Sequence, residues 1–483
     1  RSLWQNLLTF LKRFHIIKKI QSNSGVSGET ERNDVDNAAV KVVKFGGSSL
    51  SDAVQFQKVR DIILADPARR YVVPSAPGRR FDGDDKVTDL LYRCYDMAVA
   101  GEDIDEVFSR ITARYDSIVA DLGLELDLSQ QYQVIKNGFL CHVGRDYAAS
   151  RGEYLNGLIL SKYLGFHFID AARVIYFKDD GTFDGETTNR LMSELLHRHK
   201  YAVIPGFYGS MPNDTIKTFS RGGSDVTGSI VARAACADLY ENWTDVSGFL
   251  MADPRIVDNP KTISVITYHE LRELSYMGAT VLHEDAIFPV RHAGIPINIR
   301  NTNAPKAPGT LIVAQTGEGT GYTTNEIVTG IAGKRGFCVL NIQKDMMNQE
   351  VGFGRKVLEA IEKQHICFEH LPSGIDTMSV VLNAHEVEGK MEQIVNDICH
   401  VVNPDSVSVD GDLALIAVVG RGMVRAKGTA YRVFKAVSMA EVNIRMIDQG
   451  SSELNIIIGV DEHDYEKALR SIYMEFESDN KIK

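Results

Sequence analysis

The fold follows from one short stretch, Lys41-Val-Val-Lys-Phe-Gly-Gly-Ser-Ser-Leu50. The apolar run Val40–Phe45 predicts a buried strand, and Gly46-Gly47 predicts a tight turn before a helix over Val54–Leu64. Glycines let backbone N–H groups approach an anion, and a helix N-terminus adds positive partial charge. The stretch therefore predicts a phosphate-binding loop with Lys44 as its cation. The alternative is an ordinary strand-to-helix turn with a surface lysine, because the P-loop and dinucleotide glycine spacings are both absent.

The alternation of strand and helix continues along the chain. Short apolar runs at Tyr71–Val73 and Tyr201–Pro205 predict strands. Residues 86–120 predict a helical hairpin broken at Gly101, and Thr227–Ala237 predicts a further helix. Strands and helices in this order predict an α/β layer with a mostly parallel sheet. Such sheets bind ligands at the carboxyl ends of their strands.

The pattern changes after Asn301–Gly321, a Pro-, Gly-, Thr- and Asn-rich segment that predicts the end of the first domain. From there the order strand, helix, strand, strand, helix occurs twice, which predicts a pair of ferredoxin-like modules. The predicted strands are Gly330–Gln343, Ile366–His370, Thr377–Leu382, Leu413–Val419, Ile444–Asp448 and Leu454–Val460. The predicted helices are Gly352–Lys363, Val387–Cys399, Ala426–Val437 and Tyr465–Phe476.

The composition limits the class of protein. A chain of 483 residues, 44% of them apolar, predicts about two to four domains and excludes disorder over most of its length. A net charge of -11 argues against nucleic acid as the main partner, and no apolar run is long enough to span a bilayer. The six cysteines show no C-x-x-C spacing, so they predict neither a zinc ribbon nor a thioredoxin motif but scattered thiols in a reducing cytoplasm.

Residues 1–20 differ from the rest, since they carry five basic side chains and no acidic one. This basic amphipathic stretch is typical of a targeting presequence or a membrane-surface helix, and a remnant unrelated to activity is the alternative. The polar segment 21–38 has the composition of a linker. We expect residues 1–38 to be disordered and to play no part in catalysis, with order beginning near Ala39.

A second Gly-Gly loop stands directly before a helix, at Phe219-Ser-Arg-Gly-Gly-Ser-Asp-Val-Thr-Gly228. Arg221 suits the capture of a carboxylate by two parallel hydrogen bonds. Asp225, beside an anion site, pairs with a lysine, binds a metal or orients a nucleophile. The alternative is a helix N-cap made by Ser224 and Asp225, with a solvated Arg221.

Polar groups also follow a predicted strand in Trp243-Thr-Asp-Val-Ser-Gly-Phe-Leu-Met-Ala-Asp-Pro-Arg255. Thr244 and Asp245 stand at the strand end, where a nucleotide base or ribose would be bound, and two plain turns are the alternative.

In Ser150–Leu160, Gly152 and Glu153 stand before a predicted helix. Glu153 is there either a partner of the helix dipole or an anion for a substrate ammonium group.

Taken together, these motifs resemble those of the aspartokinases, which are members of the amino-acid kinase family. The motifs stand in the family's order: Lys44-Phe-Gly-Gly-Ser-Ser49, Ser75-Ala76, Val87-Thr-Asp-Leu-Leu91, Gly152-Glu153, Arg221-Gly-Gly-Ser-Asp225, Trp243-Thr-Asp-Val246 and Met277-Gly-Ala-Thr-Val-Leu-His283. Each is weak alone, but the ordered series is specific. The resemblance covers residues 39–483 and implies a catalytic domain over 39–305, a linker over 306–325 and tandem ACT regulatory modules over 326–483. It implies the monofunctional type, since the chain stops too early for an added homoserine dehydrogenase domain.

The resemblance implies that ATP phosphorylates the side-chain carboxylate of L-aspartate to 4-phospho-L-aspartate, a first step in lysine, threonine and methionine biosynthesis. Mg²⁺ is expected to bridge the phosphates with few protein ligands. In the implied roles, Lys44 stabilises the phosphates, Asp225 organises Lys44 and the nucleophile, and Arg221 grips the α-carboxylate of aspartate. The implied ATP-binding residues are Lys44, Gly46, Gly47, Ser48, Thr244, Asp245, Leu250, Arg255 and Thr280. The implied aspartate-binding residues are Thr88, Glu153 (for the ammonium group), Arg221, Gly222 and Ser224.

Two positions depart from the family pattern. Leu250 stands where many relatives carry a tyrosine against the nucleotide, which changes how the adenine is packed. Thr280 stands where many relatives carry a lysine, which removes a phosphate contact and leaves more of that role to Lys44.

The ACT pair implies an allosteric amino acid, lysine or threonine, bound between modules at the interface of a homodimer or higher homo-oligomer. ACT modules of this family can be interleaved. The matching positions are Met347, Glu350, Phe368, Glu369, Ser373, Gly374 and Asp376, for which a plain helix–strand loop is the alternative. Two competing functions are another amino-acid kinase such as glutamate 5-kinase, disfavoured by the ACT-like repeat, and a catalytically silent amino-acid sensor, disfavoured by Lys44, Arg221 and Asp225.

Overall fold

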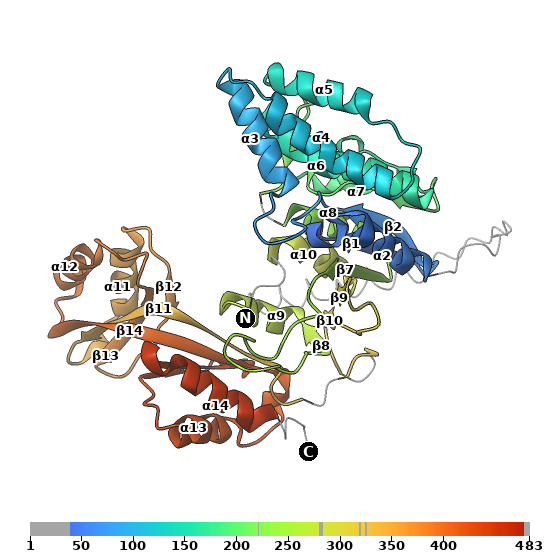
Figure 1. Ribbon diagram of the computed structural model, residues 1–483. Helices are drawn as coiled ribbons and strands as arrows, with labels where there is room; N and C mark the ends of the chain where they lie inside the picture. The colour runs from blue at the N-terminus through green and yellow to red at the C-terminus, as the bar shows by residue number, and fades with distance from the viewer. Residues whose placement is uncertain (1–38, 221, 280–283, 318–319, 324–325, 478–483) are drawn as a thin grey trace, which may run out of the picture. The chain divides into compact units, whose positions relative to one another are not determined.

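An eight-stranded sheet forms the centre of the first part of the chain (Figure 1). Its strand order is β3-β4-β2-β1-β7-β9-β10-β8, and neighbouring strands are parallel except for the antiparallel pair β9 and β10. The computed structural model describes residues 39–220, 222–279, 284–317, 320–323 and 326–477. The expected disorder of residues 1–38, and the predicted site residues Arg221 and Thr280, therefore lie outside the described residues. The strands are β1 (Lys41–Phe45), β2 (Arg69–Pro74), β3 (His167–Phe168), β4 (Ala202–Val203), β7 (Leu239–Thr244), β8 (Val265–Thr267), β9 (Ile297–Asn301) and β10 (Thr310–Val313).

Helices cover both faces of this first sheet because its strands are apolar on both sides. On β1, Val43 packs into one core and Val42 into the other. The Val43 core contains α2 (Ala53–Leu64), α3 (Val87–Val99), α4 (Asp105–Asp121), α5 (Ser129–Leu140) and α6 (Arg145–Leu164). The Val42 core contains α7 (Gly185–Leu196), α8 (Gly223–Ala234), α9 (Tyr268–Tyr276) and α10 (Glu284–Ala293). A separate hairpin pairs β5 (Tyr208–Ser210) with β6 (Ile216–Thr218).

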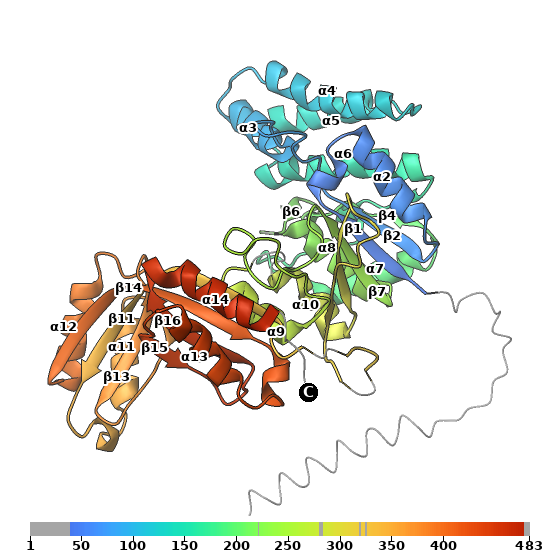
Figure 2. The ribbon, with the colours of Figure 1, turned by 60° about the horizontal axis from the view of Figure 1, so that its bottom comes forward.

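A second, antiparallel sheet follows, in the order β12-β13-β11-β14-β16-β15 (Figure 2). Its strands are β11 (Gly330–Gln343), β12 (Phe368–His370), β13 (Thr377–Asn383), β14 (Ser406–Val419), β15 (Met446–Asp448) and β16 (Asn455–Asp461). The helices are α11 (Phe353–Glu362), α12 (Met391–Val402), α13 (Thr429–Met439) and α14 (Tyr465–Glu477).

The two halves of the second sheet share the long strands β11 and β14. Residues 406–410 of β14 pair with the second half of β11, while 413–419 pair with its first half and with β16. One half is a contiguous βαββαβ unit that runs from the second half of β11 through α11, β12, β13 and α12 to residues 406–410 of β14. It is inserted between the first strand of the other half, Gly330–Lys334, and the remainder of that half. We call the half built from Gly330–Lys334, Leu413–Val419, β15, β16, α13 and α14 the second module.

Most predicted helices and strands are confirmed, but three predictions differ from the structure. Helix α8 begins at Gly223, four residues before the predicted start, because Gly222 adopts a left-handed conformation (φ 56°) and forms the N-cap. Glu153 lies in the middle of α6, which starts at Arg145 after Gly144, so the interpretation as a residue before a helix is wrong. Strand β10 falls inside the predicted linker 306–325, because its apolar Ile312 and Val313 are buried in the first sheet.

One hydrophobic core continues from the first sheet into the second module. It contains Val42 and Tyr240 of the first sheet, and also Ile331 of β11 and Leu469 and Phe476 of α14. The half of the second sheet around α11 and α12 has a core of its own. The second module is therefore packed as an extension of the first part of the chain, within the unit Val40–Lys483.

Candidate active site

Lys44 and Asp225 form the centre of the site. Lys44 Nζ lies 2.6 Å from Asp225 Oδ1 and 3.4 Å from Asn242 Oδ1, and the Asn242 amide donates to Asp225 Oδ1 at 2.8 Å. The parallel pairing of β1 with β7 places Lys44 opposite Asn242 at the carboxyl ends of both strands, and α8 supplies Asp225 from its first turn. Lys44 is 7% exposed, so its charge is oriented by these two partners and directed at the end of the sheet.

Glycines hold the backbone beside Lys44 open. Gly46 N donates to the Trp243 carbonyl at 3.0 Å, and Gly78 N donates to the Gly47 carbonyl at 2.8 Å. A Cβ added to Gly78 would lie 2.6 Å from the carbonyl carbon of Gly47, so the two loops touch through their backbones. Ser48 is exposed at the start of the 3₁₀ helix Gly47–Leu50. The predicted phosphate-binding residues Gly46, Gly47 and Ser48 thus form an open turn next to Lys44.

Glu153 is a buried carboxyl with a free acceptor. It is 6% exposed, and its Oε2 has no hydrogen-bond partner among the described residues. Burial raises the pKa of Glu153 to about 8, although a hydrogen bond from the Ala76 backbone and the nearby Arg151 act in the opposite direction. One turn further along α6, Asn156 donates to the Ser75 carbonyl at 2.6 Å. Both side chains therefore contact the loop that follows β2. Thr88 lies in the first turn of α3.

The second Gly-Gly loop is packed too tightly for any side chain. A Cβ at Gly206 would lie 2.6 Å from Ser224 Oγ, and one at Gly223 would lie 2.4 Å from the ring of Phe207. Phe207 has a φ of 82°, which is rare for a bulky residue, and its N–H donates to Thr227 Oγ1 at 3.0 Å. The structure therefore places Gly222 and Ser224 in a turn directly before Asp225, packed against the segment of the strained Phe207.

On the predicted nucleotide side, Leu250 and Arg255 line a cavity of about 730 Å³. Thr244 ends β7 and donates to Asp245 Oδ1 at 3.1 Å. Arg255 is largely exposed and pairs with Asp253 at 2.6 Å. The end of β7 and the cavity are connected by the short segment Asp245–Val246.

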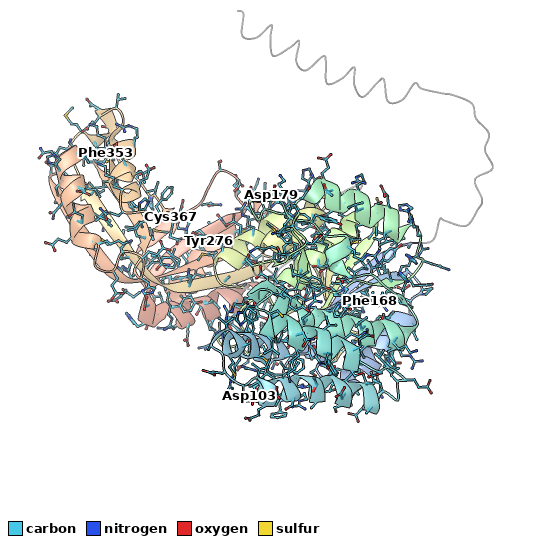
Figure 3. All side chains as sticks on the ribbon, turned by 90° about the horizontal axis from the view of Figure 1, so that it is seen from above. Asp103, Phe168, Asp179, Tyr276, Phe353 and Cys367 are labelled. Carbon is cyan, nitrogen blue, oxygen red and sulfur yellow. The ribbon has the colours of Figure 1, made fainter. Side chains whose placement is uncertain are left out.

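The predicted effector residues lie in two groups. In one, Glu350 pairs with Lys344 at 2.5 Å and with Lys356 at 2.7 Å, which lowers the pKa of Glu350, and Asp376 Oδ1 accepts from Met346 N. Met347 is buried beside them, Ser373 donates to the Leu371 carbonyl, and Gly374 N donates to the Thr377 carbonyl. In the second group, Phe368 is exposed. The carboxylate of Glu369 accepts a hydrogen bond from the hydroxyl of Tyr276, which ends α9 and lies beside Cys367 (Figure 3).

Sequence reasoning missed Asn242, Asn156 and Gly78. Asn242 is the one polar amide inside the buried run Tyr240–Trp243, which is the signal that could have found it. Asn156 and Gly78 leave no such signal, because their roles depend on the meeting of separate loops.

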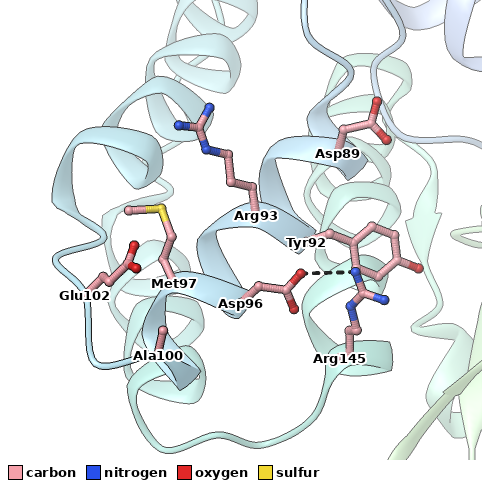
Figure 4. A pocket seen from close by; sticks show the side chains of 8 residues that line it. All are labelled: Asp89, Tyr92, Arg93, Asp96, Met97, Ala100, Glu102 and Arg145. Atoms are coloured by element: carbon pink, nitrogen blue, oxygen red, sulfur yellow. Dashed lines mark hydrogen bonds and ion pairs between the residues drawn. The ribbon is translucent and has the colours of Figure 1, made fainter.

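A further hollow of about 570 Å³ lies on the surface over α3 and the start of α6 (Figure 4). Arg145 lies over the ring of Tyr92 and pairs with Asp96 at 3.1 Å there. None of the predicted site residues lines this hollow.

Comparison with known proteins identifies the family of this chain. The model of the amino acid kinase family matches residues 39–301, and an ACT domain model matches 416–476. The chain belongs to the amino acid kinase family. Aspartokinase 3 of Bacillus subtilis is 40% identical over 453 residues, which are 90% of this chain and 98% of the relative. Within the family, the chain thus belongs to the aspartokinases with an ACT regulatory region.

Two solved structures are similar over most of this chain. The aspartate kinase of Clostridium acetobutylicum, described as an allosteric enzyme, has 53% identity and a TM-score of 0.82, and the match covers 91% of this chain and 100% of that one. Aspartokinase III of E. coli in complex with aspartate and ADP has 25% identity and a TM-score of 0.67, with the same coverage.

Proposed function

We propose that the protein transfers the γ-phosphoryl group of ATP to the side-chain carboxylate of L-aspartate, giving 4-phospho-L-aspartate and ADP. The observation that carries this proposal is the buried Lys44, fixed between Asp225 and Asn242 beside the open Gly46–Gly47 turn. The complex of the E. coli relative with aspartate and ADP supports the choice of substrates.

The reaction requires the protein mainly to position the two substrates and to neutralise charge on the phosphoryl group. A carboxylate is ionised at neutral pH, so no general base is needed to create the nucleophile. Lys44 would neutralise charge that develops on the transferring phosphoryl oxygens, and the backbone N–H groups of the glycine turn would hold the phosphates. Asp225 and Asn242 would keep the Lys44 ammonium group at that position.

Mg²⁺ fits a cradle of this composition. The described residues around Lys44 supply glycine backbone, hydroxyl groups and the single carboxylate of Asp225. Mg²⁺ retains several waters and binds phosphate oxygens with one or two carboxylates, so Asp225 is the residue that would hold it. The ion would supply charge neutralisation between the phosphates.

For aspartate, we propose that Glu153 accepts the ammonium group through its free Oε2. Thr88, Gly222 and Ser224 would complete the pocket, and Arg221 would bind the α-carboxylate. An allosteric lysine or threonine would act through the effector residues, in a homodimer or larger homo-oligomer. The six cysteines are free, which supports a cytoplasmic location, and no helix among the described residues is long and apolar enough to cross a membrane.

Hydroxylamine trapping of the acyl phosphate tests the proposal. We expect hydroxamate to form with ATP and aspartate, but not with glutamate or without an amino acid. Absence of aspartate-dependent hydroxamate from folded protein contradicts the proposed function, and a glutamate-dependent signal points to glutamate 5-kinase. Titration of lysine and of threonine in the same assay identifies the effector.

A further inference from the structure

Arg114 and Tyr115 are adjacent buried polar residues on α4. Arg114 is 7% exposed and Tyr115 is fully buried, and neither is among the predicted site residues. A buried guanidinium or hydroxyl group costs free energy unless it forms hydrogen bonds, so the partners of these two side chains indicate what they do. Those partners lie in segments that carry the proposed substrate-binding residues.

Arg114 connects two of these segments. Its Nη1 donates to the Ser51 carbonyl at 3.1 Å, and Ser51 is the residue that ends the short 3₁₀ helix of the glycine turn. Its Nη2 donates to Asp84 Oδ2 at 2.5 Å and to the Asp85 carbonyl at 3.4 Å. Asp84 and Asp85 come shortly before Thr88 in the chain. One guanidinium group therefore links the end of the glycine turn to the segment that leads into Thr88.

Asp84 is bound from two sides. Its side chain is 9% exposed, and it also accepts from Arg80 Nε at 2.9 Å. Hydrogen bonds from Arg80 and Arg114 hold the pKa of Asp84 well below its usual range, so Asp84 is ionised at neutral pH. Arg110, one turn before Arg114 on α4, pairs with Asp85, but both of these side chains are exposed. Because a buried ion pair is costly to break and an exposed pair contributes little, Arg114 holds this segment more firmly than Arg110 does.

Tyr115 holds the backbone next to Glu153. Its hydroxyl donates to the Gly152 carbonyl at 2.8 Å, and Gly152 directly precedes Glu153 in α6. A Cβ added to Gly152 would lie 3.2 Å from Leu91 Cδ1, so α6 packs closely on α3 at this point. Leu91 stands one turn after Thr88 on α3, on the same side of the helix. The Tyr115 hydroxyl therefore fixes α6 where it meets the helix that carries Thr88.

We propose that Arg114 and Tyr115 are positioning residues for aspartate: Arg114 places Thr88 relative to the glycine turn, and Tyr115 places Glu153. The proposal rests on the proposed function, which makes aspartate the phosphoryl acceptor. A displacement of roughly 1 Å can slow a reaction between two bound substrates by about 10²-fold. Arg114 touches the segments of both substrates, so its loss changes their alignment. Loss of the Tyr115 hydroxyl changes the aspartate side alone.

Steady-state kinetics of the full chain in the hydroxamate assay test the proposal. For Tyr115→Phe we expect KM for aspartate to rise about fivefold, while KM for ATP stays unchanged. For Arg114→Met we expect KM for aspartate to rise and kcat to fall, each about tenfold. Arg110→Met removes the exposed pair with the same segment, and Tyr132→Phe removes a hydroxyl that donates to Asp116 of the same helix. Both controls should keep all three kinetic constants.

A double-mutant cycle separates positioning from stability. If Arg114 acts through Asp84, the effects of Arg114→Met and Asp84→Asn on KM for aspartate should not add in the double variant. Additive effects, an equal rise of KM for both substrates in Tyr115→Phe, or a lower melting temperature with unchanged kinetic constants overturns the proposal. If Arg114→Met does not fold, Asp84→Asn and Tyr115→Phe decide the question.

Calorimetric titration with aspartate separates this proposal from the proposed function, because it measures binding without turnover. If the unaltered protein forms no hydroxamate but binds aspartate, the proposed function is contradicted. A weaker binding of aspartate to Tyr115→Phe than to Tyr132→Phe would then still support the positioning role, and equal binding would overturn it. A protein that does not bind aspartate contradicts both proposals.

Discussion

Lys44 Nζ and Asp225 Oδ1 are 2.6 Å apart, and they come from the end of β1 and the first turn of α8. Lys44 is buried, whereas the side chain of Asp225 is 18% exposed, so the pair lies at the boundary between protein and solvent. A buried ammonium group with a single carboxylate partner is positioned more than it is stabilised, because desolvation offsets much of the ion-pair attraction. We therefore propose that the pair fixes the position of the Lys44 charge at the site.

Replacing Lys44 with alanine should abolish turnover while the fold persists. The ammonium group that would face the transferring phosphoryl oxygens is lost, and such a loss lowers kcat by roughly 10²–10³-fold. Hydroxamate formation measures the rate, and circular dichroism checks the fold. Lys41→Ala is the matched control on the same strand, since Lys41 pairs with Asp66 away from the site, and it should retain activity. A Lys44→Ala enzyme with near-normal kcat refutes the role given to Lys44.

Gly78→Ala should damage catalysis through the cradle. The new Cβ would lie 2.6 Å from the carbonyl carbon of Gly47 and 2.8 Å from Ser48 N, so the glycine turn must move. We expect kcat to fall at least tenfold, in line with the sensitivity of phosphoryl transfer to positioning. Gly83→Ala in the same loop meets no atom within 4 Å; its φ of 88° costs about 1 kcal/mol of stability at most, and activity should remain. Equal kcat values in the two variants argue against the proposed cradle.

Affinity for aspartate should rise with pH because of Glu153. Burial raises the pKa of Glu153 to about 8, and only the ionised form attracts a substrate ammonium group. The ionised fraction rises roughly fivefold between pH 7 and pH 8, so KM for aspartate should fall by a similar factor. Glu153→Gln should raise KM and remove this part of the pH dependence. A wild-type KM that is flat from pH 6.5 to pH 8.5 counts against an ammonium partner with this pKa.

The same group makes a prediction for stability without substrate. The folded pKa of Glu153 lies above its ordinary value of 4.5, so the folded state holds more protons than the unfolded state between these two pKa values. The free energy of unfolding should therefore fall as pH rises from about 5 to 8. In Glu153→Gln, urea denaturation at several pH values should show a smaller fall. An unchanged slope in that variant contradicts the raised pKa.

The fold could be predicted from sequence because its signals are local. The run Val40–Phe45 with Gly46-Gly47 specifies a buried strand and a turn, and the repeated β-α-β-β-α order specifies the second sheet. Other features depend on which segments meet. The sequence places Glu153 before a helix, and its burial depends on segments distant in sequence, such as the loop at Ala76, whose backbone bonds to it. Similarly, the pairing of β11 with β14 across both halves and the meeting of Tyr465 with Gly333 arise from tertiary structure, which no local pattern encodes.

Glu270 should be a stability link between the first part of the chain and the second module. It is 2% exposed, and its Oε2 accepts from Thr267 N and Oγ1 as part of a capping box for α9. Its Oε1 accepts from Thr329 Oγ1 at 2.7 Å, just before β11, and from Arg421 N at 3.0 Å. In Glu270→Gln an amide N–H replaces one oxygen and faces donors, which leaves two of these bonds unmade. We expect the free energy of unfolding to fall by about 2–4 kcal/mol in urea denaturation.

The neighbouring His269 provides the control for Glu270, since it is exposed on the same helix. His269→Gln should change the free energy of unfolding by less than about 0.5 kcal/mol. Because Glu270 joins α9 to the residues that begin β11, its loss should also weaken the response of the rate to the effector, measured as a smaller maximal inhibition. A Glu270→Gln enzyme as stable as the His269 control would show that the four hydrogen bonds are replaced on substitution, and that the link between the two parts lies in the shared hydrophobic core instead.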